Sequence, residues 1–159
     1  MKQVLSQDAH DLLAELVEAG AEFVIVGGHA LAVHGVSRAT IDLDIFVRPD
    51  PANADRVLRA LHAFGAPTRA HGLTRSDLER EGTVYQLGLP PNRIDVITAI
   101  DGVTFDQAWS GRVLVAVDGL PTPFIGLDEL LANKRAAARA KDIADVAALV
   151  EVRQHRRPA

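Results

Sequence analysis

Val24-Ile25-Val26-Gly27-Gly28 places an apolar run directly before two glycines. Thr40-Ile41-Asp42-Leu43-Asp44-Ile45 follows, with two aspartates alternating with aliphatic residues, and Arg93-Ile94-Asp95-Val96 holds a third aspartate inside another apolar run. A carboxylate among strand hydrophobes is costly to bury unless its charge is compensated, and a divalent cation compensates it well. The three stretches therefore predict strands that carry one magnesium site.

The spacing of the aspartates supports this site. Asp42 and Asp44 are two residues apart, so on a strand both side chains leave the same face. Two carboxylates that close repel one another, and a cation between them relieves the repulsion. Asp95, on a strand expected beside theirs, completes a cage of three carboxylates. The alternative is that these acids are solvated on an edge strand.

The glycine pair has two interpretations. Gly27 and Gly28 follow an expected strand and precede an expected short helix over residues 29–34. Glycines there allow the backbone to approach a ligand, and a helix N-terminus offers free amides to a phosphate. Taken alone, the pair is equally a tight strand-to-helix turn. It matches neither a Walker A loop nor a Rossmann fingerprint.

Three stretches carry a resemblance to a known family: Gly27-Gly28-His29-Ala30, the Arg-x-Thr-x-Asp-x-Asp run from Arg38 to Asp44, and Arg93-Ile94-Asp95-Val96. Together they resemble the nucleotidyltransferase superfamily, which has the polymerase-beta-like fold. The resemblance extends to small bacterial members related to abortive-infection and minimal-nucleotidyltransferase toxin–antitoxin components. It implies metal-dependent transfer of a nucleoside monophosphate from an NTP to a hydroxyl, with release of pyrophosphate. The acceptor is then an RNA end, a protein hydroxyl or a small molecule, and a cognate toxin or antitoxin is an expected partner.

The same resemblance implies roles for individual residues. Asp42, Asp44 and Asp95 are expected to be catalytic and to bind Mg²⁺ or Mn²⁺, with one ion orienting the triphosphate and another lowering the pKa of the attacking hydroxyl. The residues expected to contact the NTP are Gly27, Gly28, His29, Arg38, Thr40, Arg93 and Lys134. The alternative is a catalytically silent nucleotide-binding module that regulates a partner protein.

Some of these side chains also have plainer explanations. For Arg38 an ion pair with a loop acid is as good an interpretation, and Arg93 either pairs with Asp95 or steers phosphate. Lys141 and Asp145 have the spacing of an ion pair within one helix. Asp142 and Asp145 belong to a Lys-x4-Arg-x-Lys-Asp-x2-Asp run that starts at Lys134, for which the resemblance implies a helix-positioning role.

The remaining pattern predicts an α+β fold, with a mixed sheet, helices packed on it and a C-terminal helical segment. Capping residues and apolar periodicity predict helices over residues 6–19, 29–34, 50–64, 75–80, 104–109, 128–140 and 142–150, the last two separate or continuous. Strands are expected over residues 23–26, 41–47, 83–87, 93–98, 112–117 and 123–125. Residues 66–82 are expected to form a mobile loop around the helix over 75–80.

Composition limits the class of protein. The 159 residues, 48% hydrophobic, fit one domain over residues 1–152, followed by a basic tail over 153–159 that is expected to be disordered. The net charge of −4 argues against a surface that grips nucleic acid all over. No apolar run approaches the ~20 residues that a membrane-spanning helix needs. There are no cysteines to form disulfides. A cytoplasmic protein with no membrane partner is expected.

Overall fold

A six-stranded mixed sheet forms the centre of the computed structural model, which describes residues 5–39 and 42–156. The strands are β1 (Phe23–Val26), β2 (Leu43–Val47), β3 (Val84–Leu87), β4 (Ile94–Ile97), β5 (Val113–Val117) and β6 (Leu120–Phe124), in the spatial order β3-β4-β2-β1-β6-β5. The helices are α1 (Gln7–Glu18), α2 (Gly27–Val33), α3 (Pro51–Phe64), α4 (Arg75–Glu79), α5 (Phe105–Ser110), α6 (Leu127–Ala137) and α7 (Ala140–Arg156).

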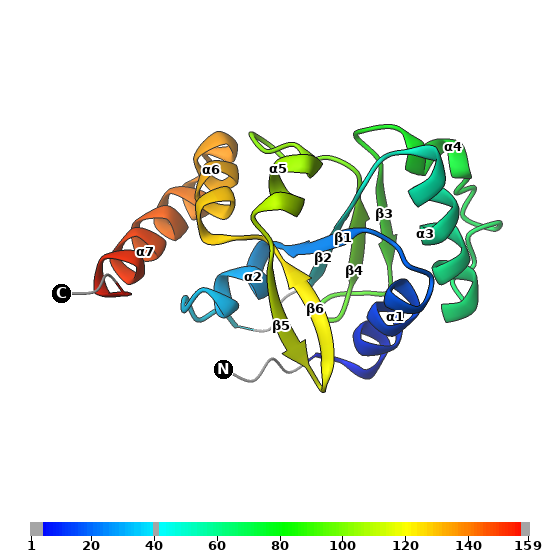
Figure 1. The fold of residues 1–159 in the computed structure, drawn as a ribbon, viewed down its shortest axis with the longest axis horizontal. Helices are drawn as coiled ribbons and strands as arrows, with labels where there is room; N and C mark the ends of the chain where they lie inside the picture. Colours follow the sequence, from blue (N-terminus) through cyan, green and yellow to red (C-terminus); the bar gives the residue numbers. More distant parts are fainter. Residues whose placement is uncertain (1–4, 40–41, 157–159) are drawn as a thin grey trace.

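Strand direction confirms the expected mixed sheet. β1 runs antiparallel to β2 and parallel to β6, whereas β2 and β4 are parallel. In Figure 1, α1, α3 and α4 lie on one side of the strands, and α2, α6 and α7 lie on the other. The α+β class follows from this arrangement of helices around a sheet with both strand directions.

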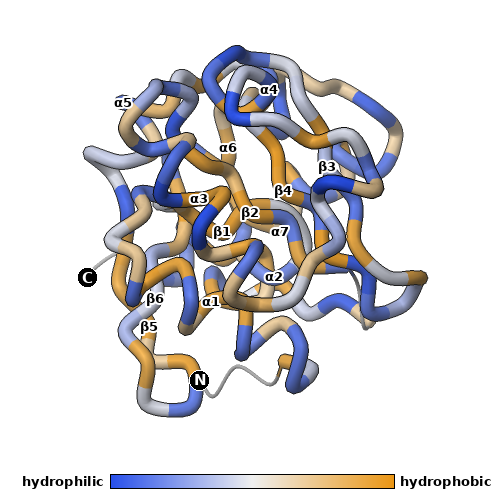
Figure 2. Tube along the Cα trace, turned by 90° about the vertical axis from the view of Figure 1, so that its right-hand side faces the viewer, coloured by the Kyte–Doolittle hydropathy of each residue, from blue (hydrophilic) through white to orange (hydrophobic). Residues whose placement is uncertain are grey.

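The core forms around the central strands. All four residues of β1 are buried, and the hydrophobic stretches of the trace concentrate where β1, β2 and β4 cross the middle of Figure 2. α1 starts at Ser6, whose hydroxyl accepts the Ala9 N–H, and it buries one apolar stripe against α3. α3 starts where Asp50 accepts the Asn53 N–H, with proline at its first position.

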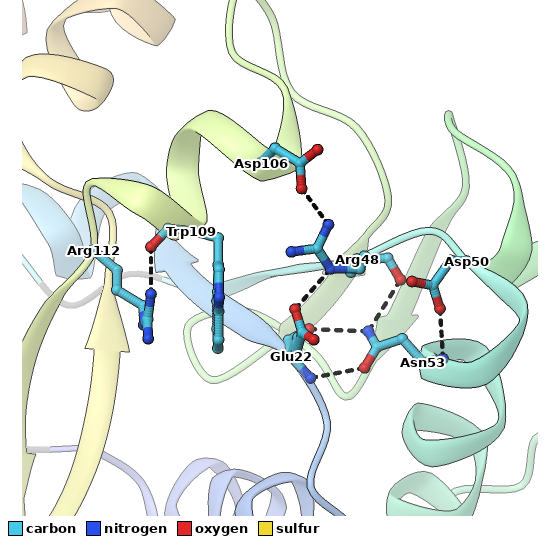
Figure 3. Close-up of polar contacts among 7 residues, drawn as sticks. All are labelled: Glu22, Arg48, Asp50, Asn53, Asp106, Trp109 and Arg112. Carbon is cyan, nitrogen blue, oxygen red and sulfur yellow. Dashed lines mark hydrogen bonds and ion pairs between the residues drawn. The ribbon is translucent and has the colours of Figure 1, made fainter.

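A polar network fastens the end of β2 to its neighbours (Figure 3). The Arg48 Nε donates to Glu22 at 2.7 Å, and its guanidinium also pairs with Asp106 on α5. Asn53 donates to the backbone carbonyls of both Glu22 and Arg48 at 3.0 Å and accepts from the Glu22 N–H. Because these bonds join the start of β1 to the end of β2, they hold the register that brings Gly27 beside Asp44 at the other end.

One boundary differs from the sequence-based expectations, and two other points agree with them or settle an open alternative. α2 begins at Gly27, so the glycine pair forms its first turn rather than a turn before it. α6 and α7 are separate helices, because Ala138 adopts a left-handed conformation with φ of +53° between them. The helix expected over residues 75–80 is present as α4, and its Leu78 is fully buried.

The C-terminal boundary also needs correction. α7 continues through Arg156, so residues 153–156 are helical where a disordered tail after residue 152 was expected. Arg153 forms an ion pair of 3.1 Å with Asp128 on α6, which a solvated tail would not make. None of the helices in the described ranges combines the length and apolar character that a membrane-spanning helix requires.

Candidate active site

Three aspartates from separate stretches of sequence come together at one edge of the central strands. Asp44 on β2 lies opposite Asp95 on β4 in the parallel register, and Asp42 directly precedes β2. Burial, followed by the charges of Asp95 and Asp42, raises the pKa of Asp44 from 3.8 to about 6, and a hydrogen bond to Asp95 adds to this shift. These three residues form the acidic cluster.

Arg93 is the cation of the acidic cluster. Its Nε and Nη2 donate to the two carboxylate oxygens of Asp95 at 2.9 and 3.2 Å. The same Nη2 lies 3.2 Å from Asp42 Oδ2, and the Arg93 backbone N–H donates to Asp42 Oδ1 at 3.1 Å. Hydrogen bonding to Asp95 raises the pKa of Arg93. Of the two roles left open for Arg93, the ion pair with Asp95 is the one present.

Gly27 allows α2 to start against the acidic cluster. Its φ is +70°, a conformation that side-chain-bearing residues rarely adopt. A Cβ at this position would also overlap the carboxylate of Asp44. The structure therefore requires glycine at this position for two independent reasons. Gly28 follows within the first turn of α2.

A second group of charges connects α6 with α7. The Lys134 Nζ lies between Asp142 and Asp145, at 3.1 and 3.2 Å from one oxygen of each. Arg139 donates to Asp142 at 2.6 Å, and Arg38 pairs with Asp145. We call these five residues the ion-pair cluster. Burial alone would raise the pKa of Asp142, but the hydrogen bonds from Arg139 and Lys134 outweigh burial and lower it to about 2.

The two clusters border one cleft of about 700 Å³. Its lining includes most of the predicted site residues, namely Gly27, Gly28, Arg38, Asp42, Asp44, Arg93, Asp95 and Lys134. His29 lies in α2 but is not among the described lining residues, and Thr40 lies outside the described part of the chain. Segments that are distant in sequence thus border a single open cleft.

The comparisons with known proteins agree with this geometry. A family model described as "Nucleotidyl transferase AbiEii toxin, Type IV TA system" matches residues 11–158. The chain belongs to this family. AbiEii membership confirms the resemblance to nucleotidyltransferases and to toxin–antitoxin components. A search of curated proteins found no match.

Solved structures show that this AbiEii-family chain has a nucleotidyltransferase fold. A candidate nucleotidyltransferase from Thermotoga maritima matches with a TM-score of 0.53 and 14% identity, over 97% of this chain and 98% of the other. The lincosamide antibiotic adenylyltransferase LnuA, bound to lincomycin, matches with a TM-score of 0.53 and 11% identity, over 94% of this chain and 99% of its own.

The cleft of this AbiEii-family protein contains residues that the sequence did not single out for the site. Arg139 lies close enough to the acidic cluster that the charge of Asp44 contributes to raising the pKa of Arg139, after the larger effects of Asp142. Lys141 lines the same cleft, and Asn133 donates to the backbone carbonyl of Asp101 at 2.9 Å. The Lys-x4-Arg-x-Lys run could have indicated that Arg139 and Lys141 lie in the cleft. No sequence pattern marks Asn133 or Asp101.

Two expected ion pairs have different partners. Asp145 bonds to Lys134 and Arg38 rather than to Lys141, four residues earlier on α7. Arg38 does form the ion pair given as its alternative, but the acid lies on a helix instead of a loop. Spacing within one helix shows which contacts are possible and says nothing of competitors from another element.

The acidic cluster has the donor chemistry of a magnesium site. Carboxylate oxygens are the ligands that Mg²⁺ and Mn²⁺ prefer. Burial, and then the charges of Asp95 and Asp42, raise the pKa of Asp44, and Arg93 offsets this only in part. No set of three His, Cys, Asp or Glu side chains within the described ranges is already in ligand geometry. Arg93 binds Asp42 and Asp95 in this structure. The three carboxylates therefore fit the ion once it replaces Arg93 as their partner.

Proposed function

We propose that this chain is a divalent-metal-dependent nucleotidyltransferase that moves a nucleoside monophosphate from an NTP to a hydroxyl of an RNA, a protein or a small molecule. One observation carries the proposal: three carboxylates with an unfavourable mutual charge line one cleft together with Lys134 and Arg139. The cleft volume of about 700 Å³ lies within the usual range of small-molecule sites, ~300–1,000 Å³.

The proposal assigns a part to each side of the cleft. Asp42, Asp44 and Asp95 would hold Mg²⁺ or Mn²⁺, which when bound neutralises the triphosphate and acidifies the attacking hydroxyl. Lys134 and Arg139, which line the cleft, would bind phosphate oxygens. Gly28, in the first turn of α2, would offer its backbone N–H to a phosphate.

The reaction follows from these parts. The acceptor oxygen forms a bond to the α-phosphorus, the bond from that phosphorus to the bridging oxygen of the β-phosphate breaks, and pyrophosphate leaves. Asp95 orients the acceptor hydroxyl and helps to remove its proton. Acid–base catalysis of this kind adds ~10²–10⁴-fold, so positioning and charge neutralisation supply most of the rate.

Transfer of label tests the proposal. The protein is incubated with each α-³²P-labelled NTP, Mg²⁺ or Mn²⁺, and total RNA or lysate from a bacterial host. Label should move to an acceptor with wild type and with the control Asp8→Asn, an exposed acid in the first turn of α1. Asp95→Asn should keep metal–NTP binding, because Asp42 and Asp44 would still hold the metal, and it should lose transfer. Undiminished transfer by Asp95→Asn would remove this residue from catalysis.

Binding of the nucleotide is measured separately by calorimetry. Asp44→Asn should lose divalent-dependent nucleotide binding while it stays folded. Gly28→Ala should weaken NTP binding by ~1–3 kcal/mol, the scale of a lost charge-assisted hydrogen bond. Equal binding of Mn²⁺–ATP by wild type and Asp44→Asn would reject the metal cage, and unchanged affinity in folded Gly28→Ala would return the glycines to a plain turn.

A second candidate function is a silent nucleotide-binding module that regulates a toxin or antitoxin partner. Its supporting observation is that Arg93 already holds two of the three carboxylates. Clear NTP binding by wild type without transfer to any acceptor would favour this alternative. In both cases the proposed place of action is the cytoplasm, together with a cognate protein of the toxin–antitoxin pair.

A further inference from the structure

β5 forms a free edge of the sheet. Within the described residues it pairs only with β6, and the hairpin that they form projects from the body of the molecule, with its turn at the bottom of Figure 1. Its sequence, Val113-Leu114-Val115-Ala116-Val117, contains no charge and no proline. Leu114 is 67% exposed. Proteins usually protect such an edge with lysine, proline or a bulge, because its unpaired backbone groups can bind another strand.

The hairpin turn shows which backbone groups are unpaired. Asp118 and Gly119 both have positive φ, +49° and +84°. These values are typical of a two-residue hairpin turn, and its closing pair here is Val117 and Leu120. The closing pair exchanges hydrogen bonds, and bonded pairs alternate along an antiparallel ladder. Val113, Val115 and Val117 therefore bond to β6, while the N–H and C=O groups of Leu114 and Ala116 point outward.

The position of two prolines on β6 agrees with this assignment. Pro123 lies opposite Leu114, and Pro121 lies opposite Ala116. Proline has no N–H to donate, so it fits the positions on β6 that need no bond to β5. Leu114 and Ala116 are left as the two residues of β5 whose backbone groups can recruit a further strand.

The outer edge of β5 is complementary to itself. In an antiparallel pair centred on Val115, Leu114 of one copy faces Ala116 of the other, and both can exchange their outward hydrogen bonds. Val115 faces its own counterpart, and Val113 faces Val117. At each end, Arg112 faces Asp118 of the other copy, so opposite charges bracket the paired apolar residues.

Arg112 is held at the start of the strand. It donates to the Trp109 carbonyl at 2.6 Å, and its guanidinium lies 3.8 Å from the centre of the Trp109 ring (Figure 3). Such contacts reduce the conformational freedom that the arginine would lose on pairing with Asp118. The positive end of the edge is therefore partly organised before a second strand arrives.

We propose that β5 is a homodimerisation edge, through which two copies of this chain pair antiparallel about Val115 with Arg112 opposite Asp118. The paired edge is short, so the dimer is weak and depends on concentration. No described residue of β5 or β6 lines the cleft, and both clefts stay open in the dimer. The pairing is thus independent of the proposed transfer reaction.

The other edge strand lacks these features and serves as a control. β3 is flanked by Thr83 and Gly88, which bring no opposite charges to its ends. Thr83 also donates through its hydroxyl to the Asp77 carbonyl at 2.7 Å, which keeps α4 beside this strand. Val84 on β3 is 59% exposed, comparable to Leu114, and a substitution there tests apolar exposure without the proposed register.

Sedimentation equilibrium over a concentration series tests the dimer. Wild type should shift from monomer to dimer as concentration rises. Leu114→Lys adds a charge beside Arg112 and should raise the dissociation constant by about tenfold or more, equivalent to ~1.4 kcal/mol. Val84→Lys should behave as wild type. A monomer up to millimolar concentration, or a dimer that Leu114→Lys leaves unchanged, would overturn the proposal, even if the edge instead binds a strand of another protein.

Cysteine cross-linking tests the register without relying on a disruptive charge. The chain has no cysteine, and Val115 is the residue that meets its own counterpart. Its pair is not hydrogen-bonded across the interface, with a Cα separation of about 4.5 Å that suits a disulfide. Val115→Cys should oxidise to a covalent dimer, whereas Val113→Cys, which faces Val117, should not. Equal cross-linking of the two variants, or none by Val115→Cys, would overturn the proposed pairing.

Discussion

The acidic cluster and the ion-pair cluster lie beside the same cleft, yet their aspartates have opposite surroundings. Asp142 is fully buried but receives hydrogen bonds from Lys134 and Arg139, so its pKa falls to about 2. Asp44 keeps some exposure, but its burial and two neighbouring carboxylates raise its pKa to about 6. A neighbouring cation makes a buried carboxylate part of the framework, whereas neighbouring acids leave it with unbalanced charge that a ligand cation can compensate.

Removal of a carboxylate from the ion-pair cluster should have the largest effect on stability. Asp142→Ala leaves Lys134 buried with less compensation, and loss of one partner from a buried ion pair costs ~3–5 kcal/mol. Urea unfolding measures the change. The matched control is Asp128→Ala, which breaks an exposed pair with Arg153 and should cost less than ~1 kcal/mol. Similar losses in both variants would contradict the structural role of the ion-pair cluster.

The same kind of change in the acidic cluster should have the opposite sign. Asp44 has a folded-state pKa of about 6 against 3.8, so its ionised form destabilises the metal-free protein by about 3 kcal/mol at neutral pH. Asp44→Asn should therefore be more stable than wild type at pH 7, by up to that amount. A clear loss of stability at pH 7 would show that the Asp44 charge is already well compensated.

The pH dependence separates the two clusters further. The raised pKa of Asp44 contributes stability below pH 4, and this contribution is lost as the pH rises through 6. The stability advantage of Asp44→Asn over wild type should therefore vanish as the pH falls from 6 to 4. A lowered pKa acts in the other direction, so the contribution of Asp142 is present above pH 4 and lost as the pH falls through 2. Urea titrations of both variants from pH 7 to 2 measure these windows, and an advantage of Asp44→Asn that persists at pH 4 would contradict them.

A smaller loss of stability is expected for a substitution at Gly27, where the backbone meets the acidic cluster. Gly27→Ala forces an unfavourable φ and pushes a Cβ against the Asp44 carboxylate, at a cost of ~1–3 kcal/mol. Gly20→Ala is the matched control, because its φ is also +70° but no atom lies within 4 Å of its Cβ position. The difference between the two in thermal or urea unfolding isolates the contact with Asp44. Equal losses would show that only backbone conformation matters at Gly27.

For Arg93→Gln the informative readout is metal binding rather than stability, because loss of this cation also leaves three close carboxylates uncompensated in the metal-free protein. The substitution removes the cation that holds Asp42 and Asp95, so the carboxylates become available to a divalent ion. Manganese binding without nucleotide, measured by calorimetry or electron paramagnetic resonance, should become several-fold tighter. Weaker binding would mean that Arg93 arranges the carboxylates for the ion instead of competing with it.

Much of the fold was predictable because its signals are local. The caps at Ser6 and Asp50 and the apolar stripes behind them define α1 and α3 without reference to other elements. The alternation of Asp42 and Asp44 with aliphatic residues likewise identifies a strand with both acids on one face. Together with the glycine pair and Asp95, these local patterns were sufficient to indicate the nucleotidyltransferase family and the acidic cluster.

Contacts between distant segments were decided only by tertiary packing. The helix spacing of Lys141 and Asp145 predicted a pair, but α6 brings Lys134 to Asp145 and the segment after α2 brings Arg38 to it. The boundary at residue 152 failed similarly, since the pairing of Arg153 with Asp128 depends on how α7 lies against α6. The sequence by itself determined which residues carry charge and which face of an element they share. Packing decided which opposite charges meet, because the energy of an ion pair depends on a distance across elements that spacing along the chain does not specify.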